Sequence, residues 1–263
     1  GNLTSSPANS GPNPFNNEII VDGVTVFEAV TGNLELFDTD IDIRQVETNS
    51  SSLDLKASQG NLSLGESRIK TVNNVAFLAN GTLDAGSASV TVPNRVSLAA
   101  NTSVTANDSQ FDADDIEIFG ATSGVLDPTK AVNGNVRLDL SRAGNTDISA
   151  LAVGDVEINH SGPGSISLER AGLEVPGTGA GPASVSSQNG SVTITSDDGT
   201  VIIGSGSNDS GATALVQAAQ NVTIDANVIE DRHNGGIDVI AGQTAKFVTA
   251  ADLGTTSNPL EVQ

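Results

Sequence analysis

The chain has 263 residues, with 32 acidic side chains against 11 basic ones and a formal net charge of -21. It contains no Cys, Met, Trp or Tyr, and aromatic residues make up 3% of it. Without cysteine, a disulfide framework, a thiolate metal site and a cysteine nucleophile are all excluded. So few basic residues argue against a nucleic-acid partner. No apolar run approaches the ~18 residues of a membrane span, so we expect none.

Two parts of different composition follow one another along the chain. Residues 1–18 contain three prolines among Asn, Ser and Gly, which is typical of a flexible tail or linker. Residues 19–263 are expected to form one domain. Within it, the stretches 176–189 and 204–212 are rich in Gly, Ser or Pro and predict projecting loops. Residues 212–220 predict one or two helical turns.

One short pattern recurs along the domain. A small or polar residue and an Asn, Asp or Ser precede alternating apolar and polar residues, which is the pattern of a strand with one buried face. In comparable copies the first apolar residue falls at positions 34, 53, 75, 96, 116, 136 and 156, a period near 20 residues. The clearest copies are GNLEL at 32–36, GNLSL at 60–64, GNVRL at 134–138, GDVEI at 154–158, GSISL at 164–168, GSVTI at 190–194 and QNVTI at 220–224.

This period predicts the fold class: an all-β, single-stranded, right-handed parallel β-helix (solenoid) with coils of about 20 residues. A β-sandwich is the alternative, because its strands also recur every ~8–12 residues, but it has no reason to keep a fixed period. About twelve coils at the ~4.8 Å strand spacing would make a rod of ~55 Å.

Like residues in successive coils are expected to lie above one another. Asn33, Asn61, Asn135 and Asn221 precede strands and predict an amide ladder that bonds the coils above and below. The seven Phe residues are expected in the core or at its ends: Phe15, Phe27, Phe37, Phe77, Phe111, Phe119 and Phe247.

Over about residues 32–263 these repeats resemble the filamentous-haemagglutinin-like β-helical regions of large secreted bacterial surface proteins, the two-partner secretion and autotransporter-type adhesins. The most specific segment is ADLGTTSNPLEV at 251–262, which is similar to the Ile-Gly-Thr…Asn-Pro-Leu segments that punctuate such proteins. The resemblance implies an extracellular or bacterial cell-surface location and an adhesive or scaffolding role. The partners it implies are glycans or proteins of host or neighbouring cells.

Some β-helical proteins are enzymes that act on polysaccharides. Polygalacturonase-like hydrolases carry an Asp pair, then a His-containing turn, then Arg-Ile-Lys. Here Arg68-Ile69-Lys70 comes before Asp114-Asp115 and His160, so the order is wrong. We expect no catalytic residue, no cofactor-binding residue and no enzymatic activity. With His160 and His233 as the only histidines, a His-rich metal site is also excluded.

Two acidic groups are weak candidates for calcium. Same-face carboxylates on one strand lie ~6.5–7 Å apart, too far to share an ion without a neighbouring coil. A solvated acidic face is the favoured interpretation, so no cofactor is expected and calcium remains the alternative. The motif GGIDV at 235–239 is similar to part of a calcium-binding repeat, in one copy. The candidates are Asp38, Asp40 and Asp42 in one group, and Asp112, Asp114 and Asp115 in the other.

Asn-x-Ser/Thr triplets begin at ten positions. Coil corners favour the same residues, so a structural interpretation is preferred over glycosylation. The candidate glycosylation sites are Asn80, Asn101, Asn189 and Asn208.

Together these features predict a non-catalytic, extracellular structural or adhesive segment of a bacterial surface adhesin or stalk. The alternative is a subunit that pairs its terminal strands end to end with copies of itself, because a contact between two different ends propagates without closing.

Overall fold

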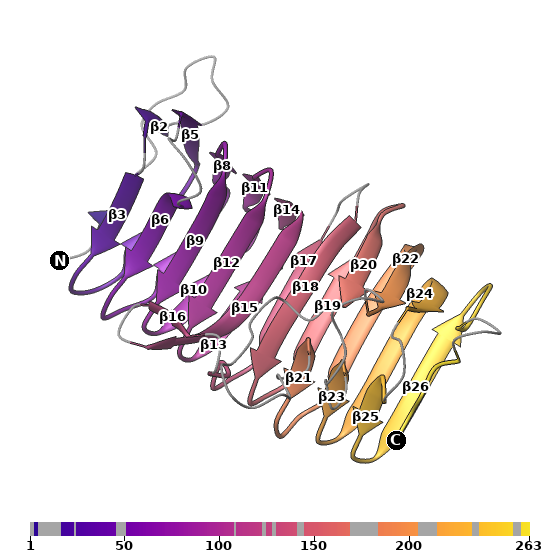
Figure 1. The fold of residues 1–263 in the computed structure, drawn as a ribbon. Coiled ribbons are helices and arrows are strands. Elements are labelled where there is room, and N and C mark those ends of the chain that lie inside the picture. Colours follow the sequence, from indigo (N-terminus) through magenta and orange to yellow (C-terminus); the bar gives the residue numbers. More distant parts are fainter. Residues whose placement is uncertain are drawn as a thin grey trace, which may run out of the picture.

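The fold is taken from a computed structural model, which describes residues 3–4, 17–23, 25–45, 51–107, 109–122, 125–127, 130–140, 145–168, 184–204, 215–232, 237–254 and 259–263. The described residues form strands and no helix, so the predicted all-β class is confirmed. Almost all strand pairs are parallel; the exception is β16 (Val125–Asp127), which runs antiparallel to β15 (Asp115–Thr122). Figure 1 shows the strands lying side by side from one end of the molecule to the other.

The first column of parallel strands contains nine members among the described residues. Each strand pairs with the next one in the column. In order, they are β3 (Thr25–Ala29), β6 (Ser51–Ala57), β9 (Asn74–Ala79), β12 (Arg95–Ala100), β15, β18 (Asn145–Ala152), β21 (Val185–Ser187), β23 (Val216–Ala218) and β25 (Val239–Ala241).

The second column contains ten strands in the described part of the chain. Their register is continuous along the column, so residues at the same position of successive strands pair with one another. They are β1 (Leu3–Thr4), β4 (Leu34–Glu35), β7 (Leu62–Ser63), β10 (Thr82–Asp84), β13 (Ser103–Ala106), β17 (Val136–Leu140), β19 (Val156–His160), β22 (Val192–Ile203), β24 (Asn221–Asp231) and β26 (Thr244–Thr249).

A third column of paired strands is built differently in the two halves of the molecule. Its first half is a separate five-stranded sheet of β2 (Asn17–Asp22), β5 (Thr39–Gln45), β8 (Arg68–Lys70), β11 (Ser89–Thr91) and β14 (Gln110–Asp112). In the second half, the start of β18 pairs with β20 (Ser165–Leu168). β20 then pairs with the end of the long strand β22, which pairs with the end of β24.

One hydrophobic cluster runs along the inside of the columns. Its members are mostly Val, Ile, Leu and Ala, as alternation predicts, because inward positions of successive strands fall on one another. Phe77 and Phe111 are fully buried in it. Phe37 was expected in the core or at its ends, but its side chain points outward and is 47% exposed. Leu34 and Leu36 take the inward positions of this segment, so Phe37 points outward with Glu35.

The segments outside the repeating pattern differ in part from the predictions made for them. The helical turns predicted at 212–220 are wrong, because β23 lies there as a strand. In the predicted tail, the described residues belong to β1 and β2; in 176–189, the described residues 184–189 include β21. The remainder of both segments, and 205–212, lie outside the described residues. No helix in the described part of the chain has the length and apolarity that a membrane crossing requires.

Candidate functional site

The repeated Gly-Asn pairs form a ladder between the turns that lead into the second column. Asn33 Oδ1 accepts a hydrogen bond from the backbone N–H of Asn61 at 2.9 Å, and Asn61 Oδ1 accepts one from Thr82 N–H at 2.9 Å. Asn135 Oδ1 does the same for Asp155 N–H at 2.9 Å. The predicted ladder is therefore present at these positions, but each side chain bonds the main chain of the next turn rather than another amide.

The same contact explains two of the glycines that precede the bonded residues, Gly81 and Gly154. A Cβ at Gly81 would collide with Asn61 Oδ1, and a Cβ at Gly154 would collide with Asn135 Oδ1. Only glycine leaves room for the side-chain oxygen that reaches from the preceding turn. The most conspicuous motif of the sequence thus belongs to the architecture and not to a ligand site.

Two of the glycosylation candidates form a true amide ladder. Asn101 Nδ2 donates to Asn80 Oδ1 at 2.9 Å, and both side chains are half-buried. Nδ2 is the atom that a glycan would modify, so this contact competes with modification of Asn101. Asn189 is exposed at a turn, and Asn208 lies outside the described residues.

The first calcium group contains an ion pair, and its three carboxylates are not close enough together to share a metal ion. Asp38 has a positive φ of 50° and precedes β5, so it leaves the row of alternating side chains. Asp40 is 7% exposed and bonds Arg68, whose Nε donates to Asp40 Oδ1 at 3.2 Å. That hydrogen bond raises the pKa of the Arg68 guanidinium. Asp42 pairs in register with Lys70.

The second calcium group lies beside an arginine. Arg95 contacts Asp115 at 3.3 Å and Glu117 at 3.1 Å. Glu117 is 6% exposed, and burial raises its pKa, while the positive charge of Arg95 acts in the opposite direction. Like the first group, Asp112, Asp114 and Asp115 are not brought within the distances at which three carboxylates share an ion.

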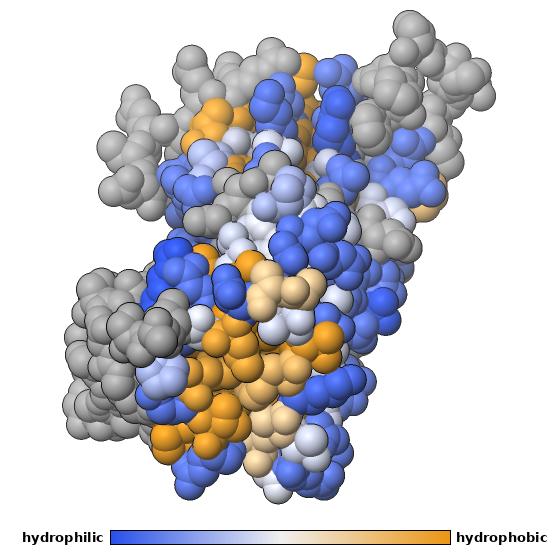
Figure 2. Space-filling view, turned by 90° about the vertical axis from the view of Figure 1, so that its right-hand side faces the viewer, coloured by the Kyte–Doolittle hydropathy of each residue, from blue (hydrophilic) through white to orange (hydrophobic). Residues whose placement is uncertain are grey.

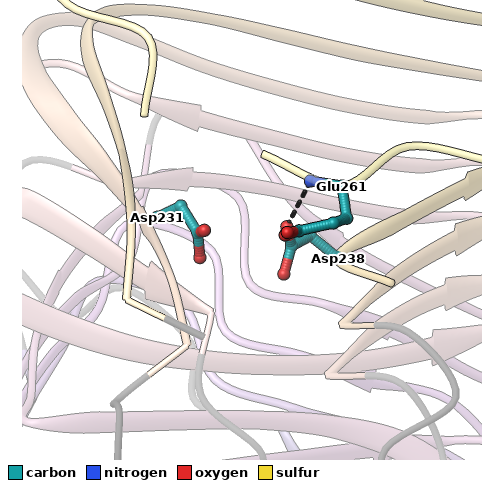
Figure 3. Close-up of side chains that lie close together, drawn as sticks. All are labelled: Asp231, Asp238 and Glu261. Atoms are coloured by element: carbon teal, nitrogen blue, oxygen red, sulfur yellow. Dashed lines mark hydrogen bonds between the residues drawn. The ribbon is translucent and has the colours of Figure 1, made fainter. Parts of the chain in front are cut away.

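A different set of acidic residues is close enough to hold a metal ion. Within the described residues, Asp231, Asp238 and Glu261 each offer one carboxylate oxygen, and these oxygens lie within 4.8 Å of one another. Figure 3 shows the carboxylates of Asp231 and Asp238 facing one another, with Glu261 beside Asp238. Asp231 and Asp238 are 3% and 0% exposed. The spacing suits calcium, whose oxygen ligands lie ~2.3–2.6 Å from the ion.

Strand pairing explains how these three carboxylates meet. Asp231 ends β24, and Asp238 directly precedes β25. Val262 bridges to Val239, and the backbone N–H of Glu261 donates to Asp238 Oδ2 at 2.7 Å. The GGIDV motif pointed to Asp238. Nothing in the sequence pointed to the other two residues, because the contact depends on the register of the last strands.

A polar pocket lies at the corner between the second and third columns. Its volume is about 410 Å³. The pocket is lined by Ser109, Gln110, Asp139, Leu140, Asn159, His160, Ser161, Thr195 and Asp197. Asn159 Nδ2 donates to Asp139 Oδ1 at 2.9 Å and to Glu157 Oε1 at 3.0 Å. Sequence patterns gave no sign of this pocket, although it contains His160.

His160 is buried and lies within hydrogen-bonding distance of a serine. Its side chain is 2% exposed, and its Nδ1 lies 3.1 Å from Ser196 Oγ. Of the three segments considered for hydrolase chemistry, only the one with His160 reaches the pocket; Arg68 and Asp114 are not among the lining residues.

Comparison with known proteins gives no match: no family model, curated protein or solved structure is similar to this chain. The function is therefore argued from the geometry and the charges described above.

Proposed function

We propose that the chain is a right-handed parallel β-helix and serves as a non-catalytic structural and adhesive segment of a bacterial surface protein. The observation that carries this proposal is the register of the two long columns. Val75, Val96 and Ile116 are successive partners in the first column, and Val136 and Val156 are partners in the second, at spacings of 20 or 21 residues. If the chain winds once around the molecule between one strand of a column and the next, the pairings in both columns follow. The right hand follows from the preference of parallel crossover connections.

The windings differ in length, and this shortens the expected rod. Val104 pairs with Val136 after 32 residues, and Val156 pairs with Val192 after 36. Each of these longer intervals still ends on the neighbouring strand of the column, so it adds one step and no extra rise. The ten described strands of the second column are separated by nine steps of ~4.8 Å, which give a rod of roughly 43 Å. This is shorter than the ~55 Å expected from a uniform period.

The physical properties of such a rod suit a place outside the cell. Its backbone groups are paired between neighbouring strands, which limits attack by proteases, and it needs no disulfides. The net charge of -21 keeps rods apart in solution. The resemblance of the repeats to haemagglutinin-like regions of secreted adhesins supports the same role.

The surface location is tested by treating intact cells of the source bacterium with a protease. Peptides of this chain should be released from intact cells, together with those of known surface proteins. A cytoplasmic protein followed in the same sample controls for lysis. Release only after the cells are broken would contradict the proposed location.

A second candidate is a subunit that associates end to end. At one end, β26 pairs with β24, and its other edge has no strand beside it among the described residues. Figure 2 looks at this end and shows hydrophobic residues gathered on it. Its exposed hydrophobic residues include Val248, Leu253 and Val262. Sedimentation velocity at rising protein concentration should then show growing filaments, whereas a constant small species would exclude this candidate.

A further inference from the structure

The pocket at the corner of the second and third columns arises from a step between neighbouring strands. β13 ends at Ala106, which pairs with Leu138, whereas β17 continues to Leu140. β19 and β22 follow β17 over this extension, because Leu140, His160 and Ser196 are successive partners. The step leaves a space of about 410 Å³, within the range of ~300–1,000 Å³ of ligand pockets.

The wall of the pocket is a row of three different polar groups in one register position. Asp139, Asn159 and Thr195 are successive partners, so a carboxylate, an amide and a hydroxyl follow one another at the ~4.8 Å strand spacing. The two bonds donated by Asn159 Nδ2 fix the amide, with its Oδ1 left as an acceptor. A row held in this way is preorganised for a ligand with several hydroxyl groups.

The charges of the pocket restrict the ligand. Asp139 and Asp197 line it, and no Lys or Arg is among the described residues that line it. Asp139 is partly compensated by Arg137, whose Nε lies 3.8 Å from Asp139 Oδ1, so repulsion of an anionic ligand such as a nucleotide or a uronic acid comes from Asp197 and from the net charge of -21. Hydroxyl groups, in contrast, donate to carboxylates and accept from hydroxyl and amide donors.

We propose that this pocket binds a neutral saccharide of one or two rings. The row of Asp139, Asn159 and Thr195 contacts neighbouring hydroxyl groups of the sugar, and Asp197 contacts it from the adjoining turn. None of the described residues that line the pocket is aromatic, so they offer no stacking contribution to the affinity. A single site should therefore bind with a dissociation constant of about 1 mM or weaker. This inference rests on the adhesive part of the proposed function and names its ligand class.

Saturation-transfer NMR on the purified chain tests this proposal. The probes are lactose, maltose, cellobiose and chitobiose, each titrated to tens of millimolar, with galacturonic acid and glucuronic acid as anionic counterparts. At least one neutral disaccharide should bind, and the uronic acids should bind at least about tenfold more weakly, a difference of ~1.4 kcal/mol.

Two pairs of variants locate the binding. Asp197→Ala and Thr195→Val change the pocket and should weaken binding at least about fivefold. Asp198→Ala and Thr193→Val are their matched controls, because Asp198 is exposed next to Asp197 and Thr193 lies outward on the same strand, yet neither lines the pocket. Thermal unfolding by circular dichroism shows that each variant keeps its fold.

The proposal is overturned if no neutral disaccharide binds, if uronic acids bind equally well, or if the pocket variants bind like their controls. Any of these results leaves the β-helical rod untouched, because the rod is measured separately by distances along its length. Release of reducing ends from a bound saccharide would support the pocket and contradict the non-catalytic part of the proposed function.

Discussion

The side-chain oxygen of Asn61 accepts a hydrogen bond from the backbone N–H of Thr82 at 2.9 Å, 21 residues further along the chain. This bond joins two successive turns of the second column, and the same contact recurs from Asn135 to Asp155. Side chains at the ends of the strands therefore join neighbouring strands of this column, in addition to the backbone pairing.

Asn61→Ala should lower the free energy of unfolding by about 1–2 kcal/mol, because the bond to Thr82 N–H is lost. Asn61→Asp is the matched control and should lose less stability, because an Asp side chain can accept the same bond. Asp155 Oδ1 already accepts the equivalent bond from Ser191 N–H at 2.8 Å. Urea unfolding measures both. Equal stability of Asn61→Ala and the wild type would show that the corner bond contributes nothing.

Gly81→Ala should destabilise the protein by more than about 2 kcal/mol, because the new methyl group meets Asn61 Oδ1. In the Asn61→Ala background that oxygen is absent, and the cost of Gly81→Ala should fall by at least ~1 kcal/mol. Gly86→Ala serves as the control, since its Cβ would lie 3.1 Å from Asp84 Oδ1, at the end of an exposed side chain. Strictly additive effects in the double mutant would contradict the proposed collision.

Glu117 should make stability depend on pH. Burial raises the pKa of Glu117 above its ordinary value of 4.5, so the folded protein binds this proton more tightly than the unfolded chain does. The associated stability is present below pH ~4.5 and is lost as the pH rises through the raised pKa. Glu117→Gln keeps the side chain uncharged, so its stability relative to the wild type should increase over the same pH range.

Urea unfolding at several pH values between 4 and 8 measures this difference. Glu157→Gln is the control, because Glu157 also pairs with an arginine, Arg137 at 3.5 Å, but its side chain is 41% exposed. The relative stability of Glu157→Gln should change less with pH. A difference between Glu117→Gln and the wild type that is constant from pH 4 to 8 would refute the assignment.

The sequence predicted those parts of the fold that depend on local pattern. Alternation in segments such as residues 134–138 predicts which side chains are buried, and the Gly-Asn pairs mark the turns. Both signals depend only on a few neighbouring residues. They therefore remain valid although the number of residues between paired strands varies. The same alternation, applied consistently, would have placed Phe37 outside with Glu35.

The pocket and the acidic cluster could not be predicted in this way. Asp139, Asn159 and Thr195 meet at intervals of 20 and 36 residues, so a constant period places Thr195 in the wrong row. The cluster of Asp238 and Glu261 depends on pairing of the last strands. Asp40 and Asp42 were assigned to an acidic face, but their positions face Arg68 and Lys70 from the next strand. Contacts between neighbouring strands of a column depend on the register of pairing, which only the structure supplies.

Distances between spin labels along the second column test the central claim, the parallel β-helix, most directly. The chain has no cysteine, so labelled cysteines can be introduced without a background. Glu35, Arg137 and Lys246 occupy one outward register position, with four steps from Glu35 to Arg137 and eight from Glu35 to Lys246. The β-helix predicts label separations near ~19 Å and ~38 Å for the two pairs, a doubling with the number of steps. Separations that do not increase with the number of steps, as in a two-layered sandwich, would contradict it.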